Sequence, residues 1–171
     1  MRNQIPASGS GRFYPEWIPP FEGEPKITDF VVSSVNETKG QGVIAQTSFD
    51  SGHLLFVFAG VIVSEITQYS LQITDDCHVH DPFFMGKVLH SCDPNAECDV
   101  VRREFRAVRP IAAGAIITMD YESTEDLLFK PFECACGAPA CRGWIAGRAF
   151  RKSAHQHGNP KVNPHESVGE R

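Results

Sequence analysis

The stretch Glu-Cys-Ala-Cys-Gly-Ala-Pro-Ala-Cys-Arg-Gly-Trp, residues 133–144, carries three of the six cysteines of the chain on one short loop. Cys134, Cys136 and Cys141 follow a Cys-x-Cys-x4-Cys spacing. Tetrahedral zinc needs four ligands, and three thiolates at such short spacing can supply three of them without strain. The spacing therefore predicts a metal-binding loop whose fourth ligand lies elsewhere in the chain.

The other cysteines, Cys77, Cys92 and Cys98, are the candidates for the fourth ligand. Cys92 has the most unusual setting, His-Ser-Cys-Asp-Pro-Asn at residues 90–95. A ligand this far from the loop would pin the C-terminal part of the chain to its middle, so metal binding would stabilise the fold. Two alternatives stay open: reduced or redox-active cysteines, and a disulfide set. The first ten residues lack the apolar segment of a signal peptide, so a secreted protein is not expected.

Length and composition indicate one domain. A chain of 171 residues is long enough for one real core and too short for two comfortable ones. Its 42% hydrophobic and 22% charged residues are ordinary for a soluble globular protein. No apolar run approaches the roughly 20 residues that a membrane span requires. We therefore expect a cytoplasmic or nuclear protein with no membrane partner.

The formal net charge of −5 argues against a phosphate-binding surface, so no direct nucleic-acid binding is expected. It is compatible with a basic partner, such as a lysine-rich peptide. The acidic residues gather at Asp75, Asp76, Asp81, Glu122, Glu125 and Asp126. For any single one of them, a solvated turn is the preferred interpretation.

The middle of the chain consists of short apolar runs separated by turn residues, which is typical of a mainly β domain built from several small sheets. The predicted strands cover residues 27–35, 42–46, 53–58, 61–64, 70–74, 100–101 paired with 105–108, and 115–119. Residues 78–82 predict a polar turn. A metal site is the alternative there, because His78 and His80 would project from one face of a strand. The two glycines of residues 40–43 predict a tight turn or a close approach of the backbone to a ligand.

The two ends of the chain differ from the middle in composition. Residues 1–26 combine glycine, serine and proline with Trp17 and Phe21. They predict a flexible arm that packs its aromatic side chains onto the domain or stays mobile. Residues 149–171 have very little apolar content and predict a disordered tail. Metal scavenging by His155, His157 and His165 is the alternative for the tail.

Several of these elements, in this order, resemble the SET-domain protein lysine methyltransferases that carry a post-SET zinc loop. The matching segments are residues 40–43 for a Gly-x-Gly turn, 58–60 for a Tyr-x-Gly element, 90–95 for Asn-His-Ser-Cys-x-Pro-Asn, 114–121 for a strand ending in Asp-Tyr, and 134–143 for the post-SET motif. The resemblance covers roughly residues 27–145. It implies a SET-domain (β-clip) fold of several small sheets, in which segments 90–95 and 114–121 cross in a pseudoknot. The SET domain would span residues 27–122, and a linker with the C-terminal zinc loop would span 123–148.

The resemblance also implies S-adenosyl-L-methionine-dependent transfer of methyl groups to the lysine ε-amine of a protein or peptide. The residues implied to hold the donor are Gly40, Gln41, Gly42, Val43, Leu89, His90, Asn95 and Trp144, the last as a cover for the adenine. The implied zinc ligands are Cys92, Cys134, Cys136 and Cys141, which leaves Cys77 and Cys98 as buried thiols. Tyr121 matches the catalytic tyrosine, whose hydroxyl would orient the amine. Candidates for the walls of the lysine channel, or for the core, are Phe83, Phe84, Phe129 and Phe132.

Two positions depart from the pattern of the family. Leu89 stands where the family has an asparagine that helps to hold the donor, and Phe58 stands where it usually has tyrosine. Two further functions stay open. One is a SET fold that has lost transfer activity and serves as a peptide-binding module. The other is an enzyme that acts on a small-molecule amine. The sequence leaves the oligomeric state open.

Overall fold

The computed structural model describes residues 11–36 and 39–151 of the protein. Its strands are β1 (Phe30–Asn36), β2 (Gly40–Ala45), β3 (Leu54–Val57), β4 (Val61–Val63), β5 (Ser70–Thr74), β6 (Cys77–His80), β7 (Leu89–His90), β8 (Ala96–Asp99), β9 (Glu104–Ala107), β10 (Thr118–Met119), β11 (Phe132–Glu133) and β12 (Trp144–Ile145). Two 3-10 helices, η1 (Met85–Lys87) and η2 (Tyr121–Ser123), complete the named elements. The predicted mainly β fold of several small sheets is confirmed.

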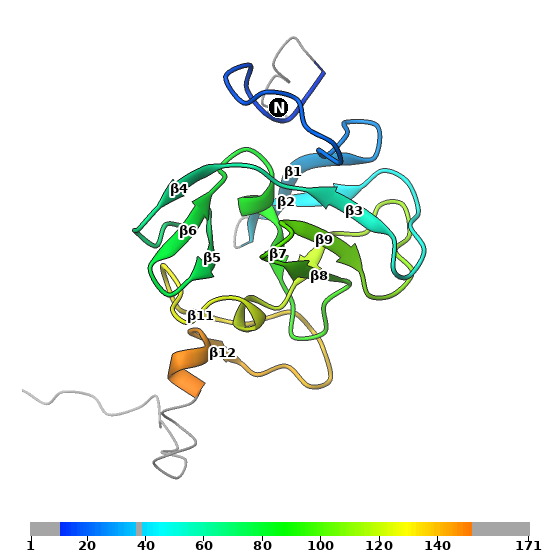
Figure 1. The fold of residues 1–171 in the computed structure, drawn as a ribbon. Coiled ribbons are helices and arrows are strands. Elements are labelled where there is room, and N and C mark those ends of the chain that lie inside the picture. Colours follow the sequence, from blue (N-terminus) through cyan, green and yellow to red (C-terminus); the bar gives the residue numbers. More distant parts are fainter. Residues whose placement is uncertain (1–10, 37–38, 152–171) are drawn as a thin grey trace, which may run out of the picture.

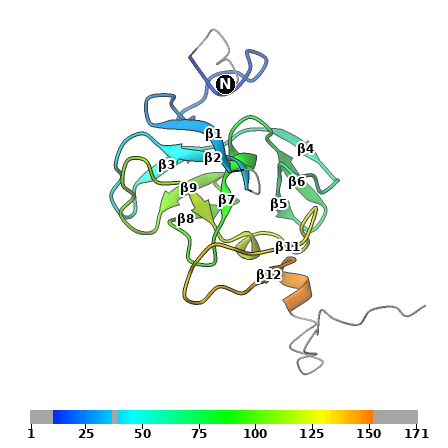
Figure 2. The ribbon, with the colours of Figure 1, turned by 180° about the vertical axis from the view of Figure 1, so that it is seen from behind.

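The strands form five small sheets rather than one large one. Two have three strands, in the orders β3-β9-β8 and β4-β6-β5, and three have two strands, β1-β2, β10-β7 and β11-β12. Figures 1 and 2 show the two three-stranded sheets on opposite sides of the molecule, with β7 between them and β11 and β12 below. The segment around β7 is therefore enclosed by elements that are far apart in sequence.

Stacked and edge-on phenylalanine rings form the centre of the core. The Phe56 ring stacks on Phe105 at a centroid distance of 4.7 Å and meets Phe84 edge-on at 4.9 Å. Phe30 of β1 meets Phe84 edge-on at 5.6 Å. Such ring pairs stabilise a core by about 0.5–1.5 kcal/mol each beyond the area they bury. The rings therefore tie β1, β3, β9 and the segment before η1 to one another.

The described part of the N-terminal arm lies against this core. Tyr14 is 1% exposed, and its hydroxyl donates to Asp81 Oδ2 at 2.8 Å. The same carboxylate accepts the backbone N–H groups of Phe83, Phe84 and Met85. The buried Asp81 carboxylate thus pairs the backbone N–H groups at the start of η1 and ties the N-terminal arm to this helix. The flexibility predicted for residues 1–26 stays a prediction, since residues 1–10 lie outside the described range.

Two of the expected local structures are wrong. Residues 77–80 form β6, the central strand of its sheet, where a polar turn was expected at 78–82. Residues 100–101 lie in a turn, and it is β8 that pairs with β9. The Asp99 carboxylate accepts the backbone N–H groups of Val101 and Arg102, and Arg103 adopts a positive φ of 57°. These features form the turn that ends β8.

The segment predicted as a strand at residues 115–119 is only partly one. Ile116 makes an isolated bridge to Ile44, and Thr118 and Met119 form β10. β10 runs parallel to β7, with Thr118 opposite Leu89 and Met119 opposite His90. This pairing brings the two segments that were expected to cross into direct contact.

Among the residues that the structure describes, no helix is long and apolar enough to cross a membrane. A short helical segment begins at Arg148 and includes the last residues that the structure describes. The predicted disordered tail lies almost wholly outside the described part of the chain, as do His155, His157 and His165.

Candidate active site and cysteine cluster

Four cysteine sulfurs meet at one point of the structure. One ligand atom from each of Cys92, Cys134, Cys136 and Cys141 lies within 4.8 Å of all the others, and the Sγ atoms of Cys92 and Cys134 are 3.9 Å apart. Zinc–sulfur bonds of about 2.3 Å in a tetrahedron place sulfurs about 3.8 Å from one another. The cluster is therefore compatible with one zinc ion.

Backbone pairing shapes the loop that carries three of these cysteines. β11 and β12 pair antiparallel at its two ends, and Cys134 N donates to Gly143 O. Gly137 and Gly143 have φ angles of 77° and 74°, a region that a side chain disfavours. These glycines allow the chain to turn twice within a few residues, so the thiols face one another.

A group of ion pairs fastens the loop to η2. The Arg142 guanidinium makes a bidentate ion pair with Asp120, with Nη1 2.7 Å from Oδ2. Its Nε lies 3.3 Å from Glu122, which also pairs with Arg151. Burial alone would raise the pKa of Asp120, but hydrogen bonds from Arg142 and the charge of this residue hold the pKa below its ordinary value. We call Arg142, Asp120, Glu122 and Arg151 the loop clamp.

Tyr121 lies directly beside this clamp, at the start of η2. Its hydroxyl donates to Val88 O at 2.8 Å, and its backbone N–H donates to His90 Nδ1 at 3.2 Å. The rings of His90 and Phe132 lie 5.2 and 6.2 Å from the Tyr121 ring. Burial, and then the charge of Glu125, raise the pKa of Tyr121 above its ordinary value. The phenol is therefore protonated at neutral pH and can act as a hydrogen-bonding group but not as a base.

His90 joins the tyrosine to the cysteine cluster. Its Nε2 lies 3.4 Å from Cys92 Sγ, while Nδ1 accepts from Tyr121. Burial lowers the pKa of His90 to about 4, with the charge of Asp120 opposing the shift. The ring is neutral at neutral pH, which suits its role as an acceptor for a backbone N–H group.

The segments predicted to hold the methyl donor also converge. A Cβ atom at Gly42 would lie only 2.8 Å from Val35 Cγ2 and 3.0 Å from Leu89 Cδ1. Gly42 therefore permits close packing of Leu89. Gly40 has a φ of 67° and nothing within 4 Å of where its Cβ would be, so a ligand can approach its backbone. The donor-binding role of these residues stays a prediction.

Asn95 and Trp144 are the two other residues expected to hold the donor. The Asn95 amide donates to Ile116 O at 2.8 Å and accepts the Thr118 N–H at 2.8 Å, so it holds segment 90–95 onto the strand before Tyr121. Trp144 of β12 is 48% exposed, which leaves its ring accessible. The donor-binding roles of both residues stay predictions.

Several residues singled out in the sequence lie elsewhere. Of the four phenylalanines expected to line a channel or the core, only Phe132 contacts Tyr121 in the ring contacts of the described residues; Phe84 is fully buried in the core, and Phe129 is 62% exposed. Phe58 is buried against Phe105. Cys77 and Cys98 are partly buried free thiols.

The histidines of β6 do not form a metal site within the part of the chain that the structure describes. His80 Nδ1 lies 2.8 Å from the Thr67 hydroxyl. His78 is 3% exposed, and both of its ring nitrogens lack a hydrogen-bond partner. The one metal-type cluster among the described residues is that of the four cysteines.

The sequence did not reveal that acidic residues organise this site. Asp81, Glu122 and Glu125 are 0%, 8% and 6% exposed, so the solvated turns expected for them are wrong. Each accepts at least one hydrogen bond or ion pair from a segment distant in sequence: Asp81 from Tyr14, Glu122 from Arg142, and Glu125 from Gln72. The arginine that follows Cys141 was the available indication for the clamp, since a buried guanidinium requires a carboxylate partner.

Comparison with known proteins identifies the fold. Residues 40–122 match the family model of the SET domain. The chain contains a SET domain. Methyltransferase flvH of Aspergillus flavus is 43% identical to it over 60 residues, which make up 34% of each chain. Histone-lysine N-methyltransferase ash1 of Drosophila melanogaster is 31% identical over 139 residues, 66% of this chain and 6% of that protein.

Solved structures share the fold of this SET domain. The methyltransferase domain of human histone-lysine N-methyltransferase SETMAR gives a TM-score of 0.56 at 17% identity, covering 69% of this chain and 58% of the other. KRYPTONITE in complex with mCHH DNA, an H3(1–15) peptide and SAH gives 0.54 at 23% identity, covering 67% and 29%. In the sequence comparison, the matched part of the chain spans about a third of Methyltransferase flvH and a small fraction of ash1.

Proposed function

We propose that the protein is a methyltransferase that uses S-adenosyl-L-methionine to methylate the lysine ε-amine of a protein or peptide. The observation that carries the proposal is the position of Tyr121. Its hydroxyl donates to the Val88 carbonyl, and its ring contacts His90 of β7 and Phe132 of β11. Hydroxyl and carbonyl oxygens at one point suit the recognition of an amine.

The chemical problem is to present a neutral amine. A lysine side chain has a reference pKa near 10.4, so deprotonation at pH 7 costs on the order of 4–5 kcal/mol. Apolar surroundings disfavour the charged form and lower this cost. Phe132 supplies an apolar ring beside Tyr121, and the protonated phenol can orient the amine without taking its proton. Holding the amine in line for displacement supplies much of the acceleration.

We assign donor binding to the backbone of residues 40–43 and of Leu89 and His90, with Asn95 and Trp144 completing the site. S-adenosyl-L-methionine would supply an electrophilic methyl group there. The contact of Leu89 with Gly42 supports this assignment, because it places the two backbone segments side by side. We assign zinc binding to the four clustered cysteines, which would fix the loop that carries Trp144.

The remaining proposals concern boundaries and partners. We propose a SET domain at residues 27–122 followed by a linker and zinc loop at 123–148, in a cytoplasmic or nuclear protein. A lysine-containing peptide is the proposed partner, supported by the H3(1–15) peptide in the KRYPTONITE complex. That complex also holds DNA, but the net charge of −5 favours no direct nucleic-acid binding by this chain.

A second candidate function is methylation of a small-molecule amine. It is favoured by the 43% identity to Methyltransferase flvH, whose name specifies no histone or other protein acceptor. The other alternative, a peptide-binding module without transfer activity, is favoured by Leu89, whose apolar side chain replaces a hydrogen-bonding amide at the donor site.

Calorimetry with S-adenosyl-L-methionine tests the proposed function. The zinc-loaded wild-type protein is expected to bind the donor with micromolar affinity, and Tyr121→Phe to bind it equally well. A wild type that does not bind, with binding restored by Leu89→Asn, would contradict the proposal and support the binding module.

A further inference from the structure

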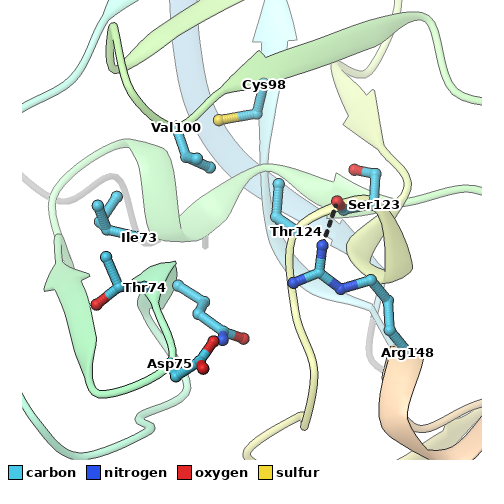
Figure 3. Close-up of a pocket in the computed structure, with 9 residues that line it drawn as sticks. Ile73, Thr74, Asp75, Cys98, Val100, Ser123, Thr124 and Arg148 are labelled. Carbon is cyan, nitrogen blue, oxygen red and sulfur yellow. Dashed lines mark hydrogen bonds between the residues drawn. The ribbon is translucent and has the colours of Figure 1, made fainter.

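A cavity of about 200 Å³ opens beside the segment that carries Tyr121. Figure 3 shows the residues around it: Ile73, Thr74 and Asp75 on one side, Ser123, Thr124 and Arg148 on the other, and Cys98 and Val100 above. Ser123 ends η2, the same short helix that Tyr121 begins. We call this space the Ser123 cavity. The cavity and Tyr121 therefore share one short segment of the chain.

One wall of the Ser123 cavity is the edge of a sheet. β5 is an outer strand of the order β4-β6-β5, and Gln72 to Asp75 line the cavity at its end. The Gln72 backbone N–H is already bonded to Glu125 Oε1 at 2.9 Å. The edge residues beyond Gln72 are exposed or partly exposed, as an extended peptide would require.

Three carboxylates, Asp75, Glu125 and Asp126, and one cation, Arg148, lie in or next to the lining of the Ser123 cavity. Glu125 lies directly behind two lining residues, because its Oε1 accepts from Gln72 N and from the Thr124 hydroxyl at 3.1 Å. Asp75 adds an exposed carboxylate at the rim. Arg148 offsets only one of these carboxylates, since its guanidinium pairs with Asp126 at 3.1 Å and donates to Ser123 O.

We propose that the Ser123 cavity receives a cationic side chain of the methyl acceptor, an arginine or second lysine near the target lysine, with Glu125 as its buried counter-charge. The inference rests on the proposed function, since it names a feature of the acceptor. The cavity is smaller than the roughly 300–1,000 Å³ typical of sites for whole small ligands, so it suits one side chain. A buried carboxylate attracts a cation more strongly than an exposed one, because less water screens the charge.

The protonation of Glu125 supports this assignment. Burial raises the pKa of Glu125 to about 7, against the hydrogen bonds from Gln72 and Thr124. The charged groups that face it are Asp126, which reinforces the shift, and Arg148, which opposes it. An ionised carboxylate is thus costly while the cavity is empty, and a bound cation would relieve that cost.

Fluorescence anisotropy with labelled peptides tests the proposal. The probes are short glycine–serine peptides with one central lysine and a single arginine moved through the flanking positions. In a matched set, neutral citrulline replaces the arginine. At one position or more, the wild type is expected to bind the arginine peptide at least about tenfold more tightly than its citrulline partner. Methyl transfer to the same peptides is measured in parallel.

Three variants locate the effect. Glu125→Gln keeps an acceptor for Gln72 and should reduce the preference to about twofold or less, and Asp75→Asn should reduce it partly without touching the interior. Glu97→Gln is the control: Glu97 precedes Cys98 on β8 and points to the opposite face, so the preference should persist. Equal binding of both peptides by the wild type, or an unchanged preference in Glu125→Gln, would overturn the inference.

The two readouts separate this inference from the proposed function. Preference in binding without methyl transfer would support the inference and count against lysine methylation. Methyl transfer at equal rates to the arginine and citrulline peptides, with no preference in binding, would support lysine methylation and count against the inference. Binding of neither peptide set would overturn both.

Discussion

Arg142→Ala should destabilise the protein by releasing the cysteine loop from η2. The side chains of Arg142 and Asp120 are each 24% exposed, and Glu122, which lies 3.3 Å from Arg142 Nε, is 4% exposed. Exposed ion pairs contribute about 0–1 kcal/mol, while breaking a fully buried pair costs about 3–5 kcal/mol. The loop clamp lies between these limits. Because Arg151 still neutralises Glu122 in the variant, we expect a loss of about 2–3 kcal/mol in the free energy of unfolding.

The assay uses urea unfolding followed by tryptophan fluorescence. The protein has two tryptophans, so a Trp17→Phe background leaves Trp144, next to the clamp, as the reporter. Arg109→Ala is the matched control, because Arg109 also pairs with one aspartate, Asp93, but the two side chains are 44% and 61% exposed. It should cost less than about 1 kcal/mol. An Arg142→Ala variant no less stable than the control would refute this account of the clamp.

Three further predictions concern the cluster, the buried acid and the donor site. Cys92→Ser should weaken zinc affinity by more than the roughly 10–100-fold typical of changes around a metal's direct ligands, while Cys98→Ser should leave it unchanged; a zinc titration against a chromogenic chelator measures both. Since the pKa of Glu125 rises from 4.5 to about 7 on folding, the native state binds the proton more tightly. The free energy of unfolding of the wild type should therefore fall by up to about 3 kcal/mol relative to that of Glu125→Gln as pH rises through that range. A difference in urea midpoint between the two proteins that is the same at pH 5 and at pH 8 would contradict this. Leu89→Asn should tighten donor binding by about tenfold in calorimetry, because it adds a hydrogen-bonding amide; weaker or unchanged binding would count against the assigned donor site.

The sequence predicts what short-range spacing determines. The spacing of Cys134, Cys136 and Cys141 is enough to suggest a metal loop, because the residues between them are too few to hold the thiols far apart. The structure brings Cys92 to the same point. The identity of the metal stays a prediction. The class of fold could be predicted for a similar reason, since short apolar runs between turn residues permit only small sheets.

The burial of polar groups could not be predicted in the same way. His78 and Gln72 occupy facing positions of β5 and β6, and polar residues there resemble a turn in the sequence. Gln72 lies inside because it bonds to Glu125 and Asp126 of a distant segment. Such a contact spans more than fifty residues, and no local pattern encodes it.

The strands of two residues illustrate the same limit. β7 and β10 form because Leu89 and His90 pair with Thr118 and Met119, which are distant in sequence. Asn95 strengthens the pairing through a side chain whose sequence context suggested a ligand contact. Propensity cannot identify such elements, since two residues contain no periodicity.

The most direct test of the central claim is methyl transfer from labelled S-adenosyl-L-methionine to lysine peptides by the zinc-loaded protein and by Tyr121→Phe. The account predicts transfer by the wild type and a loss of at least about tenfold in the variant, with donor affinity unchanged, since only the hydroxyl on the Val88 carbonyl is removed. Equal rates for both proteins, or no transfer to any lysine peptide by a wild type that binds the donor, would contradict it.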